Sequence, residues 1–317
     1  MTVDNNASLQ EEIRLLKKEK QAVIMAHYYV PAEVQEIADY IGDSLALAQI
    51  AQKVEEPVIV LCGVGFMGET AKILCPDKTV LIPDPEAGCS LADSCPAEAF
   101  GKFVKEHPDH TVVSYVNTSA DVKALSDVLV TSSNALKIVD SFPKDEKIIF
   151  GPDRNLGGYI AAQTGRDLLL WDGACHVHDR FSLEGILKLK AEHPQAKVLV
   201  HPECPRPIVL VADSVGSTAA LLAYAEKSDA TEFIVATEPG ILYEMRRRCQ
   251  GKTFLPAPPE VSEGTVGCSC NDCSYMKLNT LRKLRDCLAA GAPEVTVDAT
   301  VAEAARRPIE RMLDLSK

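Results

Sequence analysis

Three cysteines lie within six residues near the C-terminal end of the chain, at Cys268, Cys270 and Cys273. A single buried cysteine packs as a small apolar side chain, so a structural core does not need this density of thiols. Metal, cluster or redox chemistry does need it. A four-ligand zinc site uses paired C-x-x-C or Cys/His groups, and no second pair lies nearby. The spacing therefore indicates a metal or cluster site whose other ligands come from distant parts of the chain.

Side chains suited to acid–base chemistry follow three apolar segments that we expect to be strands. The pairs are His27 with Tyr29, Tyr115 with Asn117, and His201 with Glu203. In open parallel sheets, ligands bind beyond the carboxyl ends of the strands. We therefore expect these six side chains to face one pocket.

A hydroxyl residue at the start of a helix follows each pair at a constant distance. Ser44, Ser132 and Thr218 lie 44 − 27, 132 − 115 and 218 − 201 residues after the first member of the pair, which is 17 each time. Any one of these hydroxyls alone is better explained as a helix cap. Three together favour helix ends that converge on a pseudo-threefold axis, where free N–H groups hold carboxylate or phosphate.

The regular spacing predicts a triplicated α/β unit with three parallel strands in each copy. Although βαβ units resemble one another in any protein, three identical spacings between polar strand ends and helix starts are harder to reach by chance. In the first copy we also expect a helix over residues 32–40. The expected strands are 22–26, 58–60 and 80–82, then 111–114, 147–150 and 168–171, then 197–200, 232–235 and 253–256.

The predicted architecture is α/β, with three pseudo-threefold-related parallel-sheet domains around a central active site. We expect the domains at 1–87 together with 265–317, at 88–174, and at 175–264. The stretch 256–267 is rich in proline, glycine and acidic residues, and we expect it to be a loop over the mouth of the pocket.

Two further cysteines end the first two copies of the unit, at Cys89 and Cys175. One of Cys268, Cys270 and Cys273 should end the third copy. Three thiolates on one axis could hold three irons of a 4Fe-4S cluster and leave the fourth iron open as a Lewis acid. The remaining cysteines are interpreted as inert buried thiols: Cys62, Cys75, Cys95, Cys204, Cys249 and Cys287.

Composition restricts the class of protein. The chain has 317 residues, is 46% hydrophobic and carries a net charge of −12 with a pI near 5.1. Nucleic-acid binding and attachment to anionic lipid are therefore not expected. The sequence shows no membrane-spanning run and no secretion signal, and its eleven cysteines are an odd number. These features predict a cytoplasmic protein without a disulfide framework.

Short motifs in a fixed order give the sequence a close resemblance to the quinolinate synthase family of bacterial NAD biosynthesis, from about residue 22 to the C-terminus. They are 26–29 (AHYY), 42–44 (GDS), 87–92 (AGCSLA), 115–117 (YVN), 151–157 (GPDRNLG), 171–178 (WDGACHVH), 201–204 (HPEC) and 276–280 (MKLNT). The resemblance implies a transferase that condenses iminoaspartate with dihydroxyacetone phosphate to quinolinate, with release of phosphate and two waters.

The resemblance also implies one 4Fe-4S cluster per chain, with one open iron and with Cys89, Cys175 and Cys273 as its ligands. Its substrate-binding residues fall on His27, Ser44, Tyr115, Asn117, Ser132, His201, Glu203 and Thr218, and its catalytic residues on Tyr29, Glu203, His27 and His201. Some relatives have C-x-x-C-x-x-C-P where this chain has C-x-C-x-x-C-S, so the resemblance assigns no role to Cys268 or Cys270.

The residue types suggest a division of roles within that reaction. Tyr29 and His27 are expected to move protons during loss of phosphate, and Glu203 to act as the general base in later steps. An aspartate oxidase or dehydrogenase could hand over the unstable imine. Two alternatives stay open: a different cluster-dependent hydro-lyase on a related scaffold, and an iron–sulfur sensor or electron carrier.

Overall fold

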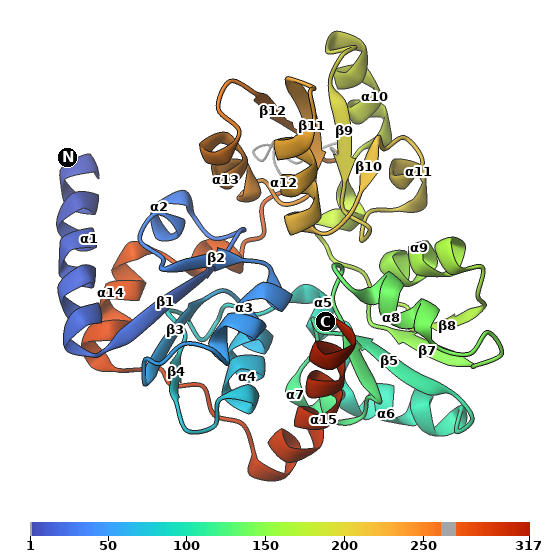
Figure 1. Cartoon of the computed structure of the whole chain (residues 1–317), viewed down its shortest axis with the longest axis horizontal. Helices are drawn as coiled ribbons and strands as arrows, with labels where there is room; N and C mark the ends of the chain where they lie inside the picture. The colour runs from blue at the N-terminus through green and yellow to red at the C-terminus, as the bar shows by residue number, and fades with distance from the viewer. Residues whose placement is uncertain (1, 261–270) are drawn as a thin grey trace.

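The structure is a computed structural model that describes residues 2–260 and 271–317. It contains three four-stranded sheets, and all neighbouring strands within them are parallel. Each sheet has the same strand order: second, first, third and fourth strand of its unit. The predicted α/β class with three related parallel sheets is confirmed. Figure 1 shows the three units grouped around a common centre.

The first unit alternates helices with strands. Its strands β1 and β3 form the middle of the sheet, and their near-continuous burial is typical of a parallel sheet covered on both faces. Its elements are α1 (Thr2–Glu19), β1 (Ala22–His27), α2 (Ala32–Gln35), β2 (Tyr40–Gly42), α3 (Ser44–Ala51), β3 (Val58–Cys62), α4 (Gly65–Leu74) and β4 (Thr79–Leu81).

The other two units repeat this order of elements without change. The second consists of α6 (Ala97–Glu106), β5 (Thr111–Tyr115), α7 (Ala120–Ala124), β6 (Val128–Val130), α8 (Ala135–Ser141), β7 (Ile148–Gly151), α9 (Arg154–Thr164) and β8 (Leu168–Leu170). The third consists of α10 (Leu183–Glu192), β9 (Lys197–Val200), α11 (Arg206–Val209), β10 (Ser214–Val215), α12 (Thr218–Lys227), β11 (Glu232–Ala236), α13 (Ile241–Arg248) and β12 (Thr253–Pro256).

A short helical turn follows the last strand of each unit, and two longer helices end the chain. The turns are α5 (Ser90–Asp93), η1 (His178–Arg180) and η2 (Met276–Leu278). Helix α14 (Leu281–Ala290) packs against α1, whereas α15 (Ala299–Leu315) packs against α4, α7 and β6 (Figure 1). The C-terminal segment therefore touches the first and the second unit. Among the described residues, no helix is both long and apolar enough to cross a membrane.

The second strand of each unit is the part of the fold that the sequence prediction missed. The nine expected strands are all present. The structure adds β2, β6 and β10, which were not expected; each has only two or three residues and lies at a sheet edge. The helix expected over 32–40 was wrong at its C-terminal end, because α2 stops at Gln35 and residues 40–42 pair with β1. Edge strands this short carry too few residues for a periodic pattern.

Some predictions concern parts of the chain that the structure does not describe. Residues 261–270 lie outside the described residues, so the loop expected over 256–267 is only partly covered, and Cys268 and Cys270 are not covered. The domain boundaries near residues 87, 174 and 264 stay predictions.

The helix starts of the three units meet through hydrogen bonds at the centre. The hydroxyl of Ser133 lies 2.8 Å from Oδ2 of Asp43 and 2.9 Å from Oγ of Ser217. Asp43 and Ser217 are also the N-caps of α3 and α12. One residue from each unit thus takes part in this junction, which places the carboxyl ends of the three sheets around a shared space.

Candidate active site

A cavity lies where the three units meet, and all the predicted site residues line it. The carboxyl ends of β1, β5 and β9 contribute their last residues and those just beyond them, and the helix starts contribute the hydroxyl residues. The predicted residues in its wall are His27, Tyr29, Ser44, Cys89, Tyr115, Asn117, Ser132, Cys175, His201, Glu203, Thr218 and Cys273.

Each of the three cysteines Cys89, Cys175 and Cys273 begins a turn of the same kind. The carbonyl oxygen of each accepts a hydrogen bond from the N–H four residues later, at 2.9 Å for Cys89, 2.9 Å for Cys175 and 3.1 Å for Cys273. The backbone N–H groups two and three residues later also lower the pKa of each thiol. These N–H groups point positive charge at the sulfur, so the turn favours the thiolate form that binds metal.

The same three cysteines differ from the others in their exposure. Cys89, Cys175 and Cys273 are partly buried, while the six cysteines interpreted as structural are fully buried. Burial raises the pKa of Cys89 to about 12 and raises the pKa values of Cys175 and Cys273, although the backbone N–H groups oppose this rise. A positive charge beside the sulfurs is therefore needed to keep them ionised near neutral pH.

Buried carboxylates hold the backbone of two of these cysteines. Asp153 caps α9 and accepts the N–H of Cys175 at 3.2 Å. Glu238 accepts the N–H of Cys273 at 3.2 Å and also pairs with the ammonium of Lys277 at 2.7 Å. Both carboxylates follow the third strand of their sheets, so the fold supplies these anchors at equivalent positions.

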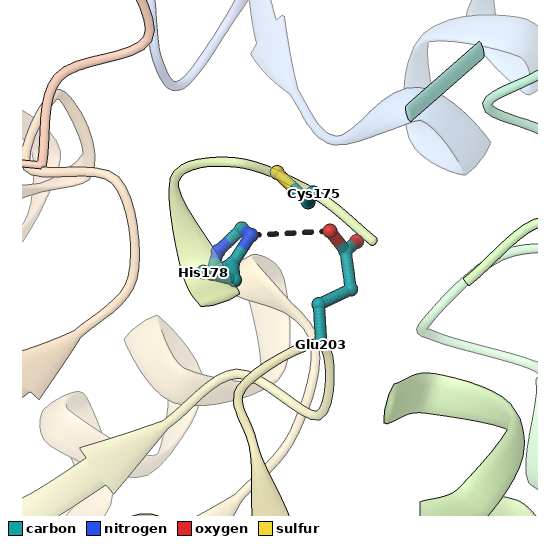
Figure 2. Close-up of side chains that lie close together, drawn as sticks. All are labelled: Cys175, His178 and Glu203. Carbon is teal, nitrogen blue, oxygen red and sulfur yellow. Dashed lines mark ion pairs between the residues drawn. The ribbon is translucent and has the colours of Figure 1, made fainter. Parts of the chain in front are cut away.

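One group of metal-ligating side chains is closer together than the cysteines are. Among the described residues, Cys175, His178 and Glu203 form the one set of three whose ligand atoms all lie within 4.8 Å of one another (Figure 2). The three cysteines do not meet that limit. The three sulfurs therefore do not all lie within reach of one ion, whose ligands stand about 2 Å from it.

Glu203 is buried among polar side chains. Its carboxylate oxygens lie 2.5 Å from the hydroxyl of Tyr115 and 3.1 Å from Nδ1 of His178. Burial alone would raise its pKa, but the neighbouring His178 and His201 and the contacts with His178 and Tyr115 outweigh burial and lower the pKa to about 2. Glu203 is therefore an ionised acceptor in this state.

His27 and His201 have the same local geometry in the first and third units. Nδ1 of His27 accepts the N–H of Tyr29 at 3.2 Å, and Nδ1 of His201 accepts the N–H of Glu203 at 3.3 Å. Burial lowers the pKa of each ring to about 3. Both rings are thus neutral near pH 7, and Nε2–H is the group that each can offer to a ligand.

Anion recognition in this cavity has to work without cationic side chains. The described residues that line it include neither lysine nor arginine. Ser44 and Thr218 are the first residues of α3 and α12, while Ser132 lies in a turn three residues before α8. The expectation that all three hydroxyls lie at helix starts is therefore met directly in two units and approximately in the second.

Comparison with known proteins decides the family. A family model described as "Quinolinate synthetase A protein" matches residues 11–314. The chain is 55% identical to the quinolinate synthase of Nostoc punctiforme over 304 residues, covering 96% of this chain and 92% of that protein. It is 53% identical to the quinolinate synthase of a Synechococcus strain over 315 residues, covering 99% and 97%. The chain belongs to the quinolinate synthetase A family.

The quinolinate synthase of Chloroherpeton thalassium is also 53% identical, over 309 residues that cover 98% of this chain and 95% of that protein. This level of identity along almost the whole length confirms the resemblance that the short motifs indicated. It also means that the family includes all three units and both C-terminal helices of this chain.

Several residues in or behind the cavity wall were not assigned a role from the sequence. They are Asp153, His178, Thr237, Glu238 and Lys277, and most of them form the inner hydrogen bonds of the site. A signal for three of them was available, because Asp153, Thr237 and Glu238 follow the third strands of their sheets. The sequence-based prediction covers only the carboxyl end of the first strand in each unit.

Proposed function

We propose that the chain is a quinolinate synthase, a transferase that condenses iminoaspartate with dihydroxyacetone phosphate and releases phosphate and two waters. Membership of the quinolinate synthetase A family supports the reaction. The observation that carries the site assignment is the single cavity in which three identical cysteine turns meet the polar strand ends. These features give one cavity a possible cluster site together with acid–base groups.

The donor set of Cys89, Cys175 and Cys273 fits a 4Fe-4S cluster. The thiols are partly exposed, each lies in a turn whose N–H groups face the sulfur, and their spacing exceeds that of ligands to one ion. When bound, such a cluster supplies an iron with an open position, which acts as a Lewis acid toward a hydroxyl group. The buried anchors Asp153 and Glu238 would keep two of the ligand loops in place.

The substrates bring carboxylates and a phosphate into a cavity without lysine or arginine. Hydroxyl and backbone N–H groups at Ser44, Ser132 and Thr218 are suited to hold them. The Nε2–H groups of His27 and His201 would donate to carbonyl or hydroxyl oxygens, and the amide of Asn117 could orient a further oxygen. These hydroxyl, N–H and amide donors are neutral, so they can bind anions without placing a cationic side chain beside the reacting atoms.

Proton movement is assigned to Tyr29 and Glu203. Burial raises the pKa of Tyr29 well above its usual value, so the phenol is a proton donor near neutral pH. Glu203 is unprotonated and can accept, although a pKa of about 2 makes it a weak base in this state. Anionic substrate and cysteine thiolates would raise that pKa through charge repulsion and so strengthen the base.

The test uses anaerobically reconstituted protein and measures iron content, visible absorption and quinolinate formation. Cys89→Ser, Cys175→Ser and Cys273→Ser should each remove both the cluster and the activity. Cys62→Ser and Cys287→Ser serve as matched controls because both residues are buried, and they should keep both.

Two results would contradict the proposal. Full iron content in Cys273→Ser would move the third ligand to another cysteine. Turnover of a hydroxy acid without dihydroxyacetone phosphate, with no quinolinate formed, would instead favour a hydro-lyase. Omission of each substrate in turn separates these outcomes.

A further inference from the structure

The backbone around Tyr29 belongs to the first unit, but a buried glutamine joins it to the third. Nε2 of Gln35, the last residue of α2, donates to the carbonyl oxygens of Tyr28 and Val30 at 2.8 and 2.9 Å. It also lies 3.0 Å from the carbonyl oxygen of Gly240, in the loop between β11 and α13. One amide therefore holds the residues on both sides of Tyr29 and ties them to the third unit.

The third unit approaches this backbone most closely at Gly240. A methyl group on Gly240 would come within 2.7 Å of Cα of Tyr29 and 2.8 Å of the carbonyl oxygen of Tyr28, separations that a Cβ atom essentially never shows. Glycine is therefore the residue that lets the two chains approach here. The carbonyl oxygen of Tyr29 itself accepts from Nζ of Lys277 at 2.7 Å, and Lys277 also pairs with Glu238 of the same loop. Tyr29 is thus held against residues 238–240 from several sides.

The three carbonyl groups fix the orientation of the Gln35 amide. The reverse orientation would point its oxygen at three other oxygens, so the nitrogen must face them. Gln35 is 1% exposed, and its Oε1 has no hydrogen-bond partner among the described residues. A buried polar atom without a partner destabilises a fold, so an apolar side chain of the same size would serve packing alone better. The donor is therefore the property that explains a glutamine at this position.

The second unit has a donor at the equivalent position. Lys123 of α7 lies 123 − 35 = 88 residues after Gln35, and Thr118 lies 118 − 30 = 88 residues after Val30. Lys123 is fully buried, and its Nζ donates to the carbonyl oxygen of Thr118, as Gln35 does to that of Val30. An N–H donor to this loop is therefore common to two units, and the nitrogen of a lysine can supply it.

We propose that Gln35 is a positioning residue for Tyr29. Its amide fixes the backbone on both sides of Tyr29 against the third unit and so sets where the phenol lies in the cavity. The phenol depends on this placement, because its hydroxyl lies 2.6 Å from Oγ1 of Thr218, which belongs to the third unit. Gln35 is not among the residues that line the cavity, so it acts through Tyr29. The inference rests on the proposed function, because it assumes that Tyr29 acts on the substrate.

The experiment compares Gln35→Met, which removes the donor at similar volume, with Gln35→Lys, which keeps one. We expect Gln35→Met to lower kcat of the anaerobically reconstituted enzyme about 10- to 100-fold, because a displacement of about 1 Å can cost a reacting group about 100-fold in rate. KM should change by less than about 3-fold. Gln35→Lys should bring kcat back to within about 5-fold of wild type, because its nitrogen keeps N–H groups with or without the extra proton.

Thr70→Val is the matched control for the loss of a buried hydrogen bond. Thr70 is a buried residue of the same unit whose hydroxyl also donates to a backbone carbonyl group, that of Phe66. The Thr70→Val enzyme should keep kcat within about 3-fold of wild type. Gly240→Ala perturbs the same contact from the third unit, and it should lower kcat as Gln35→Met does. It therefore tests the proposal even if Gln35→Met fails to fold, and Gly158→Ala, in open space, is its control.

A second measurement does not depend on activity. Carbon NMR of cluster-free protein, labelled at the tyrosine ring carbon that bears the hydroxyl, reports the hydrogen bonding of each phenol. The signal of Tyr29 is identified by its loss in Tyr29→Phe. Gln35→Met and Gly240→Ala should shift this signal, while Gln35→Lys and Thr70→Val should leave it near its wild-type position. If the wild type makes no quinolinate, the proposed function fails and the NMR result decides the positioning role on its own.

Three results would overturn the proposal. The first is wild-type kcat in Gln35→Met, or in Gly240→Ala if only that variant folds. The second is an equal loss in Gln35→Met, Gln35→Lys and Thr70→Val, which would indicate a packing effect and not a donor. The third is an unchanged Tyr29 signal in the variants that lower kcat, which would show that the phenol keeps its place without the amide.

Discussion

The anchor formed by Glu238 should control how long the third cysteine keeps its place. Glu238 is fully buried, accepts N–H groups of Cys273 and Gly240 at 3.2 and 2.7 Å, and pairs with Lys277 at 2.7 Å. Glu238→Gln keeps one acceptor oxygen but turns the other into a donor that faces a donor. The substitution therefore removes the charge and at least one hydrogen bond at constant shape.

The expected cost follows from the burial of the pair. Removing one partner from a buried ion pair costs about 3–5 kcal/mol. The side chain of Lys277 is 30% exposed, so solvent can recover part of that loss, and about 2–3 kcal/mol remains. At 1.4 kcal/mol per tenfold change, the Cys273 segment should open about 30- to 140-fold more often.

The assay follows the loss of iron to a chelator from anaerobically reconstituted protein, together with hydrogen exchange of residues 273–278 in the cluster-free form. Glu238→Gln should speed both by a factor in this range. Glu244→Gln is the control, because Glu244 is a buried carboxylate of the same unit that pairs with Arg247 and contacts none of the three cysteine turns. Equal rates for wild type and Glu238→Gln, or equal acceleration in both variants, would refute a local anchor.

Three further predictions concern stability and can be checked by urea unfolding of the cluster-free protein. Burial lowers the pKa of His27 and of His201 to about 3, so the unfolded chain binds more protons than the folded chain below pH 6.5. The free energy of unfolding should therefore fall as the pH drops from about 6.5 toward 3, by up to about 2.7 kcal/mol per pH unit. A flat profile would contradict this. Gly173→Ala should lower the free energy of unfolding by about 1–3 kcal/mol, because the new methyl would come within 2.6 Å of a backbone oxygen. Gly158→Ala, where the methyl meets open space, should raise it by about 0.5–1 kcal/mol. Similar values for the two variants would contradict this reasoning. Burial lowers the pKa of Lys123 to about 8, so the unfolded chain binds more protons between pH 8 and 10.5 and the stability of the wild type should rise over that range. Lys123→Met should remove this rise, and a rise of equal size in the variant would contradict the argument.

The sequence predicted the fold well wherever a segment was long enough to show a pattern. Central strands such as β1 and β3 are continuous apolar runs, and the corresponding strands of the other two units recur at similar spacing along the sequence. Edge strand β10 has two residues, Ser214 and Val215, which carry no periodic signal. It is held as a strand by pairing with β9, a tertiary contact that local sequence does not encode.

The site was predictable in its outer part and not in its inner part. Residues at or just beyond the ends of the first strands could be found because each copy places a polar side chain there, as with His27 and His201. The contact between Thr237 and His178 joins residues 59 apart, and neither has a counterpart of the same type in the other copies. Such contacts depend on how two units pack, so a single sequence gives no spacing from which to predict them.

Repetition and divergence play different parts in this molecule. The three cysteine turns are the same in each unit, as the proposed cluster with one ligand from each unit would require. The positions two residues beyond the third strands differ, being Val64, Asp153 and Glu238, so only the second and third units can supply a carboxylate anchor. A symmetric scaffold can place three ligands, but an asymmetric reaction needs different groups at equivalent positions. The triplicated fold therefore provides the geometry, and the departures from the repeat provide the chemistry.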